Sequence, residues 1–125
     1  METWFRRSGT VAAVIFLFFA SAFAQAPDYA HIAKQAVTNL ASANYDAVEQ
    51  AMKPEMAQEV PGQILQLVWM HVVRRFGAFQ QITGVTSKPV KEQQLVEVAC
   101  QFAHGPVTVE WIINAQGQIT GLHFQ

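Results

Sequence analysis

Few side chains in this sequence are suited to catalysis, and their spacing matches no common catalytic motif. Outside the first 24 residues the serines are Ser42 and Ser87, and neither is surrounded by a G-x-S-x-G elbow. A serine hydrolase needs such a nucleophile together with a base and an orienting acid. Cys100 could be a thiol nucleophile with His71 or His123 as its base. The simpler interpretation is a small buried hydrophobic side chain, because Cys100 stands in an apolar alternating segment.

The other titratable side chains predict no metal site and no cofactor. The four histidines are dispersed, and no pair of cysteines accompanies them. A small isomerase or lyase would need an acid or base placed in an apolar pocket. His71 and Glu110 are the best candidates for that role, and such an enzyme stays open as the alternative to a non-catalytic domain. The histidines are His31, His71, His104 and His123.

Apolar and aromatic side chains are the stronger functional candidates. They are spread over one predicted helix and two predicted strands, and together they would line a pocket for a hydrophobic ligand. Packing within the core is the alternative explanation for the same residues. The candidate pocket residues are Trp69, His71, Val72, Phe76, Val98, Cys100, Phe102, Val109 and Trp111.

Residues 1–24 have the three regions of a signal peptide. Arg6 and Arg7 precede an unbroken apolar run over residues 11–20, and a small-x-small site ends at Ala24. Cleavage is predicted between Ala24 and Gln25. An uncleaved anchor is the alternative, but its core is short of the roughly 20 apolar residues that span a bilayer. We expect a secreted or periplasmic protein whose membrane contact is confined to this segment before cleavage.

Residues 25–125 are enough for one domain. They carry six basic and eight acidic side chains, a net charge of −2, and no basic stripe typical of nucleic-acid binding. Cys100 is the sole cysteine, so no intramolecular disulfide can form. The expected partners are an apolar small molecule or another protein of the cell envelope, and a homodimer is possible.

The first half of this domain predicts three helices. Asp28 can cap a helix that continues to Leu40, and residues 46–52 form a short second helix that Pro54 ends. A loose turn is expected around residues 54–56. Pro61 suits the first position of a third helix, which Gly77 ends. That helix is so apolar that we expect burial on more than one side. Its main stripe is Leu65, Trp69, Val72 and Phe76.

The second half alternates with a period of two and predicts four strands, over residues 80–88, 95–102, 107–114 and 119–124. A four-residue turn would place Phe102 opposite Val107, with all apolar residues on one face. Glu97 and Glu110 would then lie on the outer face. A bulge at Gly121 would return the end of the last strand to the core.

Helices followed by strands predict an α+β fold rather than an alternating α/β fold. The helix that contains Trp69 would cover the apolar face of one curved antiparallel sheet, giving a cone.

The sequence also resembles a bacterial family of secreted domains of unknown function. The helical half carries the resemblance in NYDAV at 44–48, Met56, the Val60–Pro61 pair, Trp69 and FGAF at 76–79. The strand half carries it in VEVACQF at 96–102, the His104–Gly105 pair and GQITGLHF at 117–124. Members of this family occur alone or ahead of α/β-hydrolase or serine-peptidase domains. The resemblance implies a cone similar to nuclear transport factor 2 or cystatin, and it implies no catalytic residues.

Overall fold

The computed structural model describes residues 26–125. The predicted signal peptide and its cleavage between Ala24 and Gln25 lie outside these residues. None of the helices within residues 26–125 is long and apolar enough to cross a membrane.

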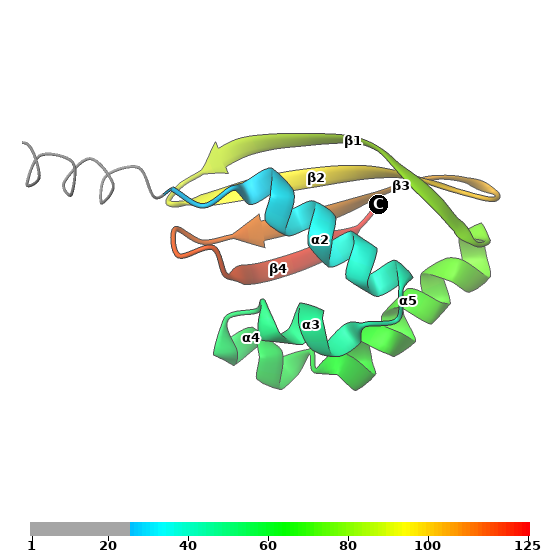
Figure 1. Ribbon diagram of the computed structural model, residues 1–125, viewed down its shortest axis with the longest axis horizontal. Coiled ribbons are helices and arrows are strands. Elements are labelled where there is room, and N and C mark those ends of the chain that lie inside the picture. The colour runs from blue at the N-terminus through cyan, green and yellow to red at the C-terminus, as the bar shows by residue number, and fades with distance from the viewer. Residues whose placement is uncertain (1–25) are drawn as a thin grey trace, which may run out of the picture.

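The described residues form helices followed by one antiparallel sheet, so the predicted α+β class is confirmed (Figure 1). The sheet order β1-β2-β3-β4 follows the chain, which means that each strand pairs with its neighbour in sequence. The elements are α2 (Tyr29–Ala41), α3 (Tyr45–Gln50), α4 (Pro54–Glu59), α5 (Gly62–Phe76), β1 (Phe79–Val90), β2 (Gln93–Phe102), β3 (Gly105–Ile113) and β4 (Ile119–Phe124).

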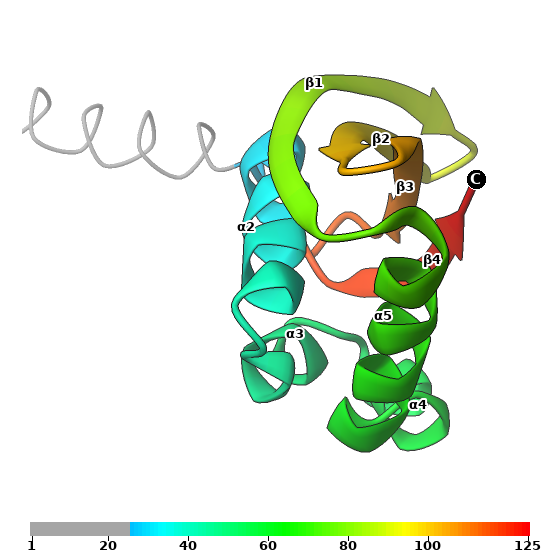
Figure 2. The ribbon, with the colours of Figure 1, turned by 90° about the vertical axis from the view of Figure 1, so that its right-hand side faces the viewer.

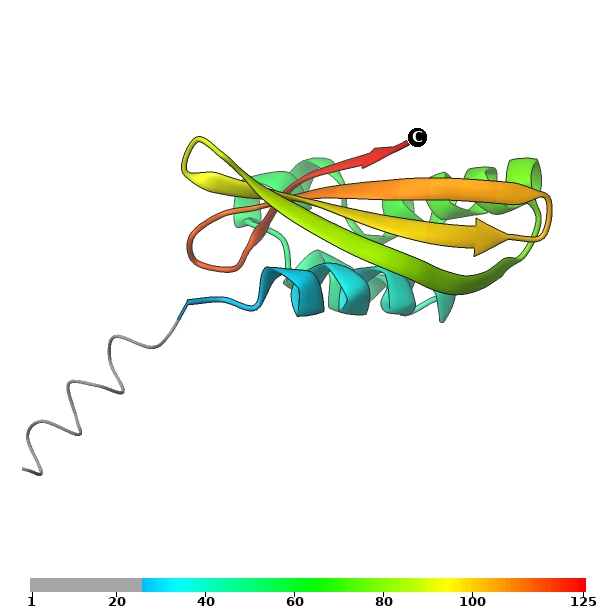
Figure 3. The same cartoon turned by 90° about the horizontal axis from the view of Figure 1, so that it is seen from above.

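The helices lie against one face of a strongly twisted sheet. Viewed from the end, α2 and α5 run along the two sides of the molecule, and β1 curls over the other strands (Figure 2). From above, the long strands β1, β2 and β3 cross over the helical layer at an angle (Figure 3). This arrangement is consistent with the expected cone.

The first helix begins as the sequence predicts. The Asp28 Oδ1 atom accepts a hydrogen bond from the backbone N–H of His31 at 3.1 Å, which satisfies one of the free donors of the first turn. The apolar face of α2 then packs into the core through Ala33, Ala36, Val37 and Leu40.

A helix replaces the loose turn expected around residues 54–56. Pro54 opens α4, where its missing N–H is not needed for a helical bond. Pro61 is the cap of α5 rather than its first residue. The Glu49 Oε1 atom accepts a hydrogen bond from the Gly62 N–H at 2.7 Å, so α3 supplies the cap for α5.

The expectation that the Trp69 helix is buried on more than one side is wrong. Leu65 and Trp69 face the core, whereas Leu67 is 62% exposed and Ile64 is 40% exposed. The sheet covers only the inner face of α5, so the outward apolar side chains of this helix remain in contact with solvent.

The turn between β2 and β3 is shorter than the four residues expected. Phe102 pairs with Gly105, so Cys100 lies opposite Val107 and not opposite Val109. Because the register differs by two residues, the inward and outward faces stay as predicted. The prediction of which strand residues form the core is therefore correct, although the predicted cross-strand partners are wrong.

The predicted bulge in the last strand is present one residue earlier. Gly121 pairs with Ile112, Ile119 pairs with Ile113, and Thr120 is the extra residue between them. Ile119 is fully buried, and the later apolar residues of β4 also pack against the core. At the other edge of the sheet, β1 continues through Pro89, which an edge strand tolerates.

Candidate functional site

Most of the candidate pocket residues lie in the packed core. The members on β2 and β3 are at most 1% exposed and belong to one continuous apolar cluster: Val98, Cys100, Phe102, Val109 and Trp111. Burial raises the pKa of the Cys100 thiol from its ordinary 9.0 to about 11, which favours the protonated form. These side chains support the fold and do not line the grooves described below.

Four aromatic rings join α5 to the sheet. The ring of Trp69 lies 5.6 Å from Phe102, 6.1 Å from Phe79 and 6.4 Å from Phe124. Phe79 and Phe102 meet edge to face at 5.5 Å. Because each ring is held by at least one other, Trp69 and Phe79 form a rigid wall at this end of the sheet.

An open groove of about 560 Å³ lies against this wall, and we call it the apolar groove. It is formed by the end of α2, the second half of α5 and the start of β1. Six of its seven lining residues are apolar, and the seventh is an arginine. They are Ala41, Trp69, Met70, Val73, Arg74, Ala78 and Phe79. Its volume is within the range of about 300–1,000 Å³ typical of small-molecule sites.

Gly77 sets the geometry of this groove. Its φ of +86° turns the chain from α5 into β1, and a Cβ atom there would lie 2.8 Å from the Ala103 Cβ. The turn between β2 and β3 is bonded to the same junction: the Ala103 N–H donates to the Ala78 carbonyl and the His104 N–H donates to the Phe76 carbonyl. The groove wall is therefore fixed by backbone contacts as well as by rings.

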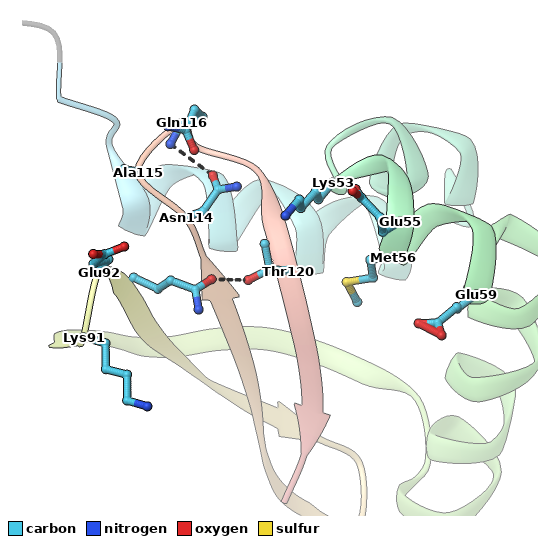
Figure 4. Close-up of a pocket in the computed structure, with 11 residues that line it drawn as sticks. Lys53, Glu55, Met56, Glu59, Lys91, Glu92, Asn114, Ala115, Gln116 and Thr120 are labelled. Carbon is cyan, nitrogen blue, oxygen red and sulfur yellow. Dashed lines mark hydrogen bonds between the residues drawn. The ribbon is translucent and has the colours of Figure 1, made fainter.

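A second hollow, of about 760 Å³, lies at the opposite end of the sheet, and we call it the polar cleft (Figure 4). Its floor groups bond to one another: the Thr120 hydroxyl donates to Gln93 Oε1, and the Gln116 N–H donates to Asn114 Oδ1. Side chains of both charge signs surround it. They are Lys53, Glu55, Glu59, Lys91 and Glu92. Such a surface is well solvated without a ligand.

The candidate acid–base residues do not converge. His71 is exposed on α5 and is not among the residues that line the apolar groove. Glu110 lies on the outer face of the sheet, where Gln125 Nε2 donates to its carboxylate. Glu97 shares that outer face. The exposed side of α5 and the outer face of the sheet lie on different sides of the molecule. His71 therefore cannot act together with Glu110 or Glu97 on one substrate.

Two further observations bear on site chemistry. Among residues 26–125, no group of three or more His, Cys, Asp or Glu side chains could hold a metal ion. The Trp111 indole Nε1 is buried with no hydrogen-bond partner in the same part of the chain. Because Trp111 lies in the core on β3, this unsatisfied donor is a cost to stability.

Trp69 is the member of the predicted pocket set that lines the apolar groove. Val72 and Phe76 belong to the core-facing side of α5. The predicted pocket set did not include Met70, Val73 and Arg74, because each lies beside the main apolar stripe. It also missed Ala41, Ala78 and Phe79, which meet α5 only through the tertiary fold. The FGAF segment at 76–79 was the available signal, since its glycine marks the turn that brings Phe79 to Trp69.

One family model matches the chain over residues 33–122, and its description is "Protein of unknown function (DUF3887)". A search of curated proteins and a search of solved structures gave no match. The matched range covers most of the sequence. It contains β1, β2 and β3 in full and β4 as far as Leu122. The chain therefore belongs to this family of proteins of unknown function.

Proposed function

We propose that this member of DUF3887 is an exported, non-catalytic domain that binds an apolar small molecule in the apolar groove. The groove itself carries this proposal: it is apolar on nearly all sides, open to solvent and walled by the Trp69 and Phe79 rings. Covering this apolar surface with a ligand favours binding, by about 25 cal/mol per Å² of apolar area buried.

Export is part of the same proposal. The signal-peptide pattern of residues 1–24 supports a secreted or periplasmic location after cleavage between Ala24 and Gln25. The order of helices and strands supports a cone related to nuclear transport factor 2. A ligand of the cell envelope is then the natural occupant.

A protein partner is the second candidate occupant, and one observation favours it. Ile64, Leu67 and Met70 are all at least 40% exposed on the outer side of α5, and Met70 also lines the groove. An apolar row continuous with a groove suits a protein surface as well, including that of a second copy. Light scattering of the purified protein tests this second candidate. A dimer of the parent protein that becomes a monomer in Leu67→Glu would support it.

The test of the small-molecule proposal uses octanamide, a neutral molecule with an eight-carbon chain. We expect saturable binding to the purified protein in isothermal titration calorimetry. Ala41→Phe places a ring in the groove from the end of α2 and should weaken binding by at least about tenfold, or 1.4 kcal/mol.

The matched control is Ala115→Phe, in the polar cleft at the opposite end of the sheet. It should leave octanamide affinity unchanged. If both variants bind octanamide like the parent protein, or if no binding occurs, the proposal is wrong. Circular dichroism melts of both variants check that the fold is retained.

A further inference from the structure

The apolar groove has one charged side chain among its seven lining residues. Arg74 is exposed in the last turn of α5 and is one of the residues that line the groove. An exposed arginine covers apolar surface with its aliphatic stem and keeps its guanidinium in water. The other six lining residues carry no charge. A ligand that fills the groove therefore ends beside a single cation.

The neighbouring cation is engaged elsewhere. The guanidinium of Arg75 lies 5.5 Å from the centre of the Phe76 ring on the same helix, a cation–π geometry. Arg75 is not a lining residue of the groove. Arg74 is thus the cation that a bound molecule meets.

No carboxylate stands on the elements that form the groove. The sequences of α2, α5 and β1 contain no Asp or Glu. The carbonyl ends of α2 and α5 both lie at the groove and contribute about −0.5 charge each, and the two positive charges of Arg74 and Arg75 together exceed that sum. The charge at the groove mouth is therefore positive, whereas the polar cleft at the other end of the sheet carries three glutamates beside its two lysines.

From this charge pattern we infer that the ligand of the apolar groove is an amphipathic anion, with an apolar chain or ring against Trp69 and Phe79 and a carboxylate at Arg74. A guanidinium presents paired N–H donors that match a carboxylate. The site is open to water, so this contact selects the head group while apolar burial supplies most of the affinity. The inference rests on the proposed function and adds the class of ligand to it.

The test compares three probes with the same eight-carbon chain: octanoate, octanamide and octylammonium. Each is titrated into the purified protein at pH 7 below the concentration at which it forms micelles. Octanoate should bind about three- to tenfold more tightly than octanamide, and octylammonium more weakly than either. Raising the salt concentration should reduce the preference for octanoate and leave octanamide affinity nearly constant.

Two arginine variants test which side chain causes the preference for octanoate. Arg74→Gln should abolish the preference, so that octanoate and octanamide bind with equal affinity whatever effect the shorter side chain has on both. Arg75→Gln is the matched control, since it removes a neighbouring cation that does not line the groove, and it should keep most of the preference.

The outcomes distinguish the inference from the proposal beneath it. If all three probes bind equally well and Ala41→Phe weakens all of them, the groove binds apolar ligands and the anionic class is wrong. If Arg74→Gln and Arg75→Gln reduce the preference equally, the assignment to Arg74 is wrong. If none of the probes binds, the proposed function itself fails. Pelleting of the protein with phosphatidylglycerol vesicles but no octanoate binding would point to a membrane surface and would also contradict the inference.

Discussion

The Trp69 ring lies 5.6 Å from the Phe102 ring and is tilted by 53° to it, which ties the middle of α5 to the end of β2. Both side chains are nearly or fully buried. Because Trp69 also forms part of the apolar groove, one side chain joins the core of the domain to its candidate site.

Trp69→Ala should lower the free energy of unfolding by about 3–5 kcal/mol, because a large ring leaves a cavity beside Phe79 and Phe102. Urea denaturation measures the change. Leu67→Ala on the same helix is the control, since Leu67 is 62% exposed and its loss should cost no more than about 0.5 kcal/mol. Equal costs for the two variants would argue against the packing of α5 on the sheet.

Gly77→Ala should destabilise the domain by about 1–3 kcal/mol, since the residue has a φ of +86° and its new Cβ would lie 2.8 Å from that of Ala103. Thermal and chemical denaturation both report this loss. Gly84→Ala is the matched variant, because no atom lies within 4 Å of a Cβ at that position in β1. It should be neutral or slightly stabilising. A loss of stability as large as that of Gly77→Ala would show that the junction between α5 and β1 has no particular need for glycine.

Cys100 should react slowly with a thiol reagent in the native protein and rapidly in denaturant, because it is buried and burial raises its pKa to about 11. The folded-state pKa is above the ordinary 9.0, so folding favours the protonated thiol. This contribution to stability is fully present below about pH 9 and is lost as the pH rises towards 11.

Cys100→Ala provides the reference for that pH dependence. Lysine and tyrosine side chains titrate in the same range, so the quantity to measure is the difference in unfolding free energy between parent and variant. We expect this difference to shift in favour of the variant between pH 9 and 11. A difference that stays constant over this range would contradict a buried, protonated thiol.

N-terminal sequencing of the exported protein should begin at Gln25, because the small-x-small site ends at Ala24. A start at Pro27 would mean that the peptidase uses residues 24–26 instead. Recovery of intact Met1 in a membrane fraction would overturn the prediction of cleavage.

The faces of the strands and the ends of the main helices could be predicted from the sequence. Alternation fixes which side of β2 and β3 is buried. The capping bonds of Asp28 and Gly77 join residues only a few positions apart, namely His31 N–H to Asp28 Oδ1 and Gly77 N–H to the Val73 carbonyl. Turn length is harder, since a two-residue and a four-residue turn after Phe102 give the same faces. The helix α4 was missed because Pro54 can end one helix and begin the next with equal ease.

The apolar groove was mostly beyond prediction for a different reason. The sequence showed that Trp69 is apolar and central. The groove, however, lies between the end of α2, the second half of α5 and the start of β1, which come together only in the fold. Ala41 and Ala78 have no distinctive pattern, and their role depends on which large side chains stand nearby. The place of His71 beside the buried stripe likewise does not reveal that the sheet covers only one side of α5 and leaves His71 exposed.

Chemical-shift mapping by nuclear magnetic resonance tests the apolar-groove proposal most directly. Octanamide is titrated into the isotope-labelled protein, and the shifts of backbone amides and tryptophan indoles are followed. Saturable changes should cluster on Ala41, Met70, Val73, Ala78 and Phe79 and on the Trp69 indole. Changes centred on the polar cleft around Lys53, Asn114 and Thr120, or no saturable change at all, would contradict the proposal.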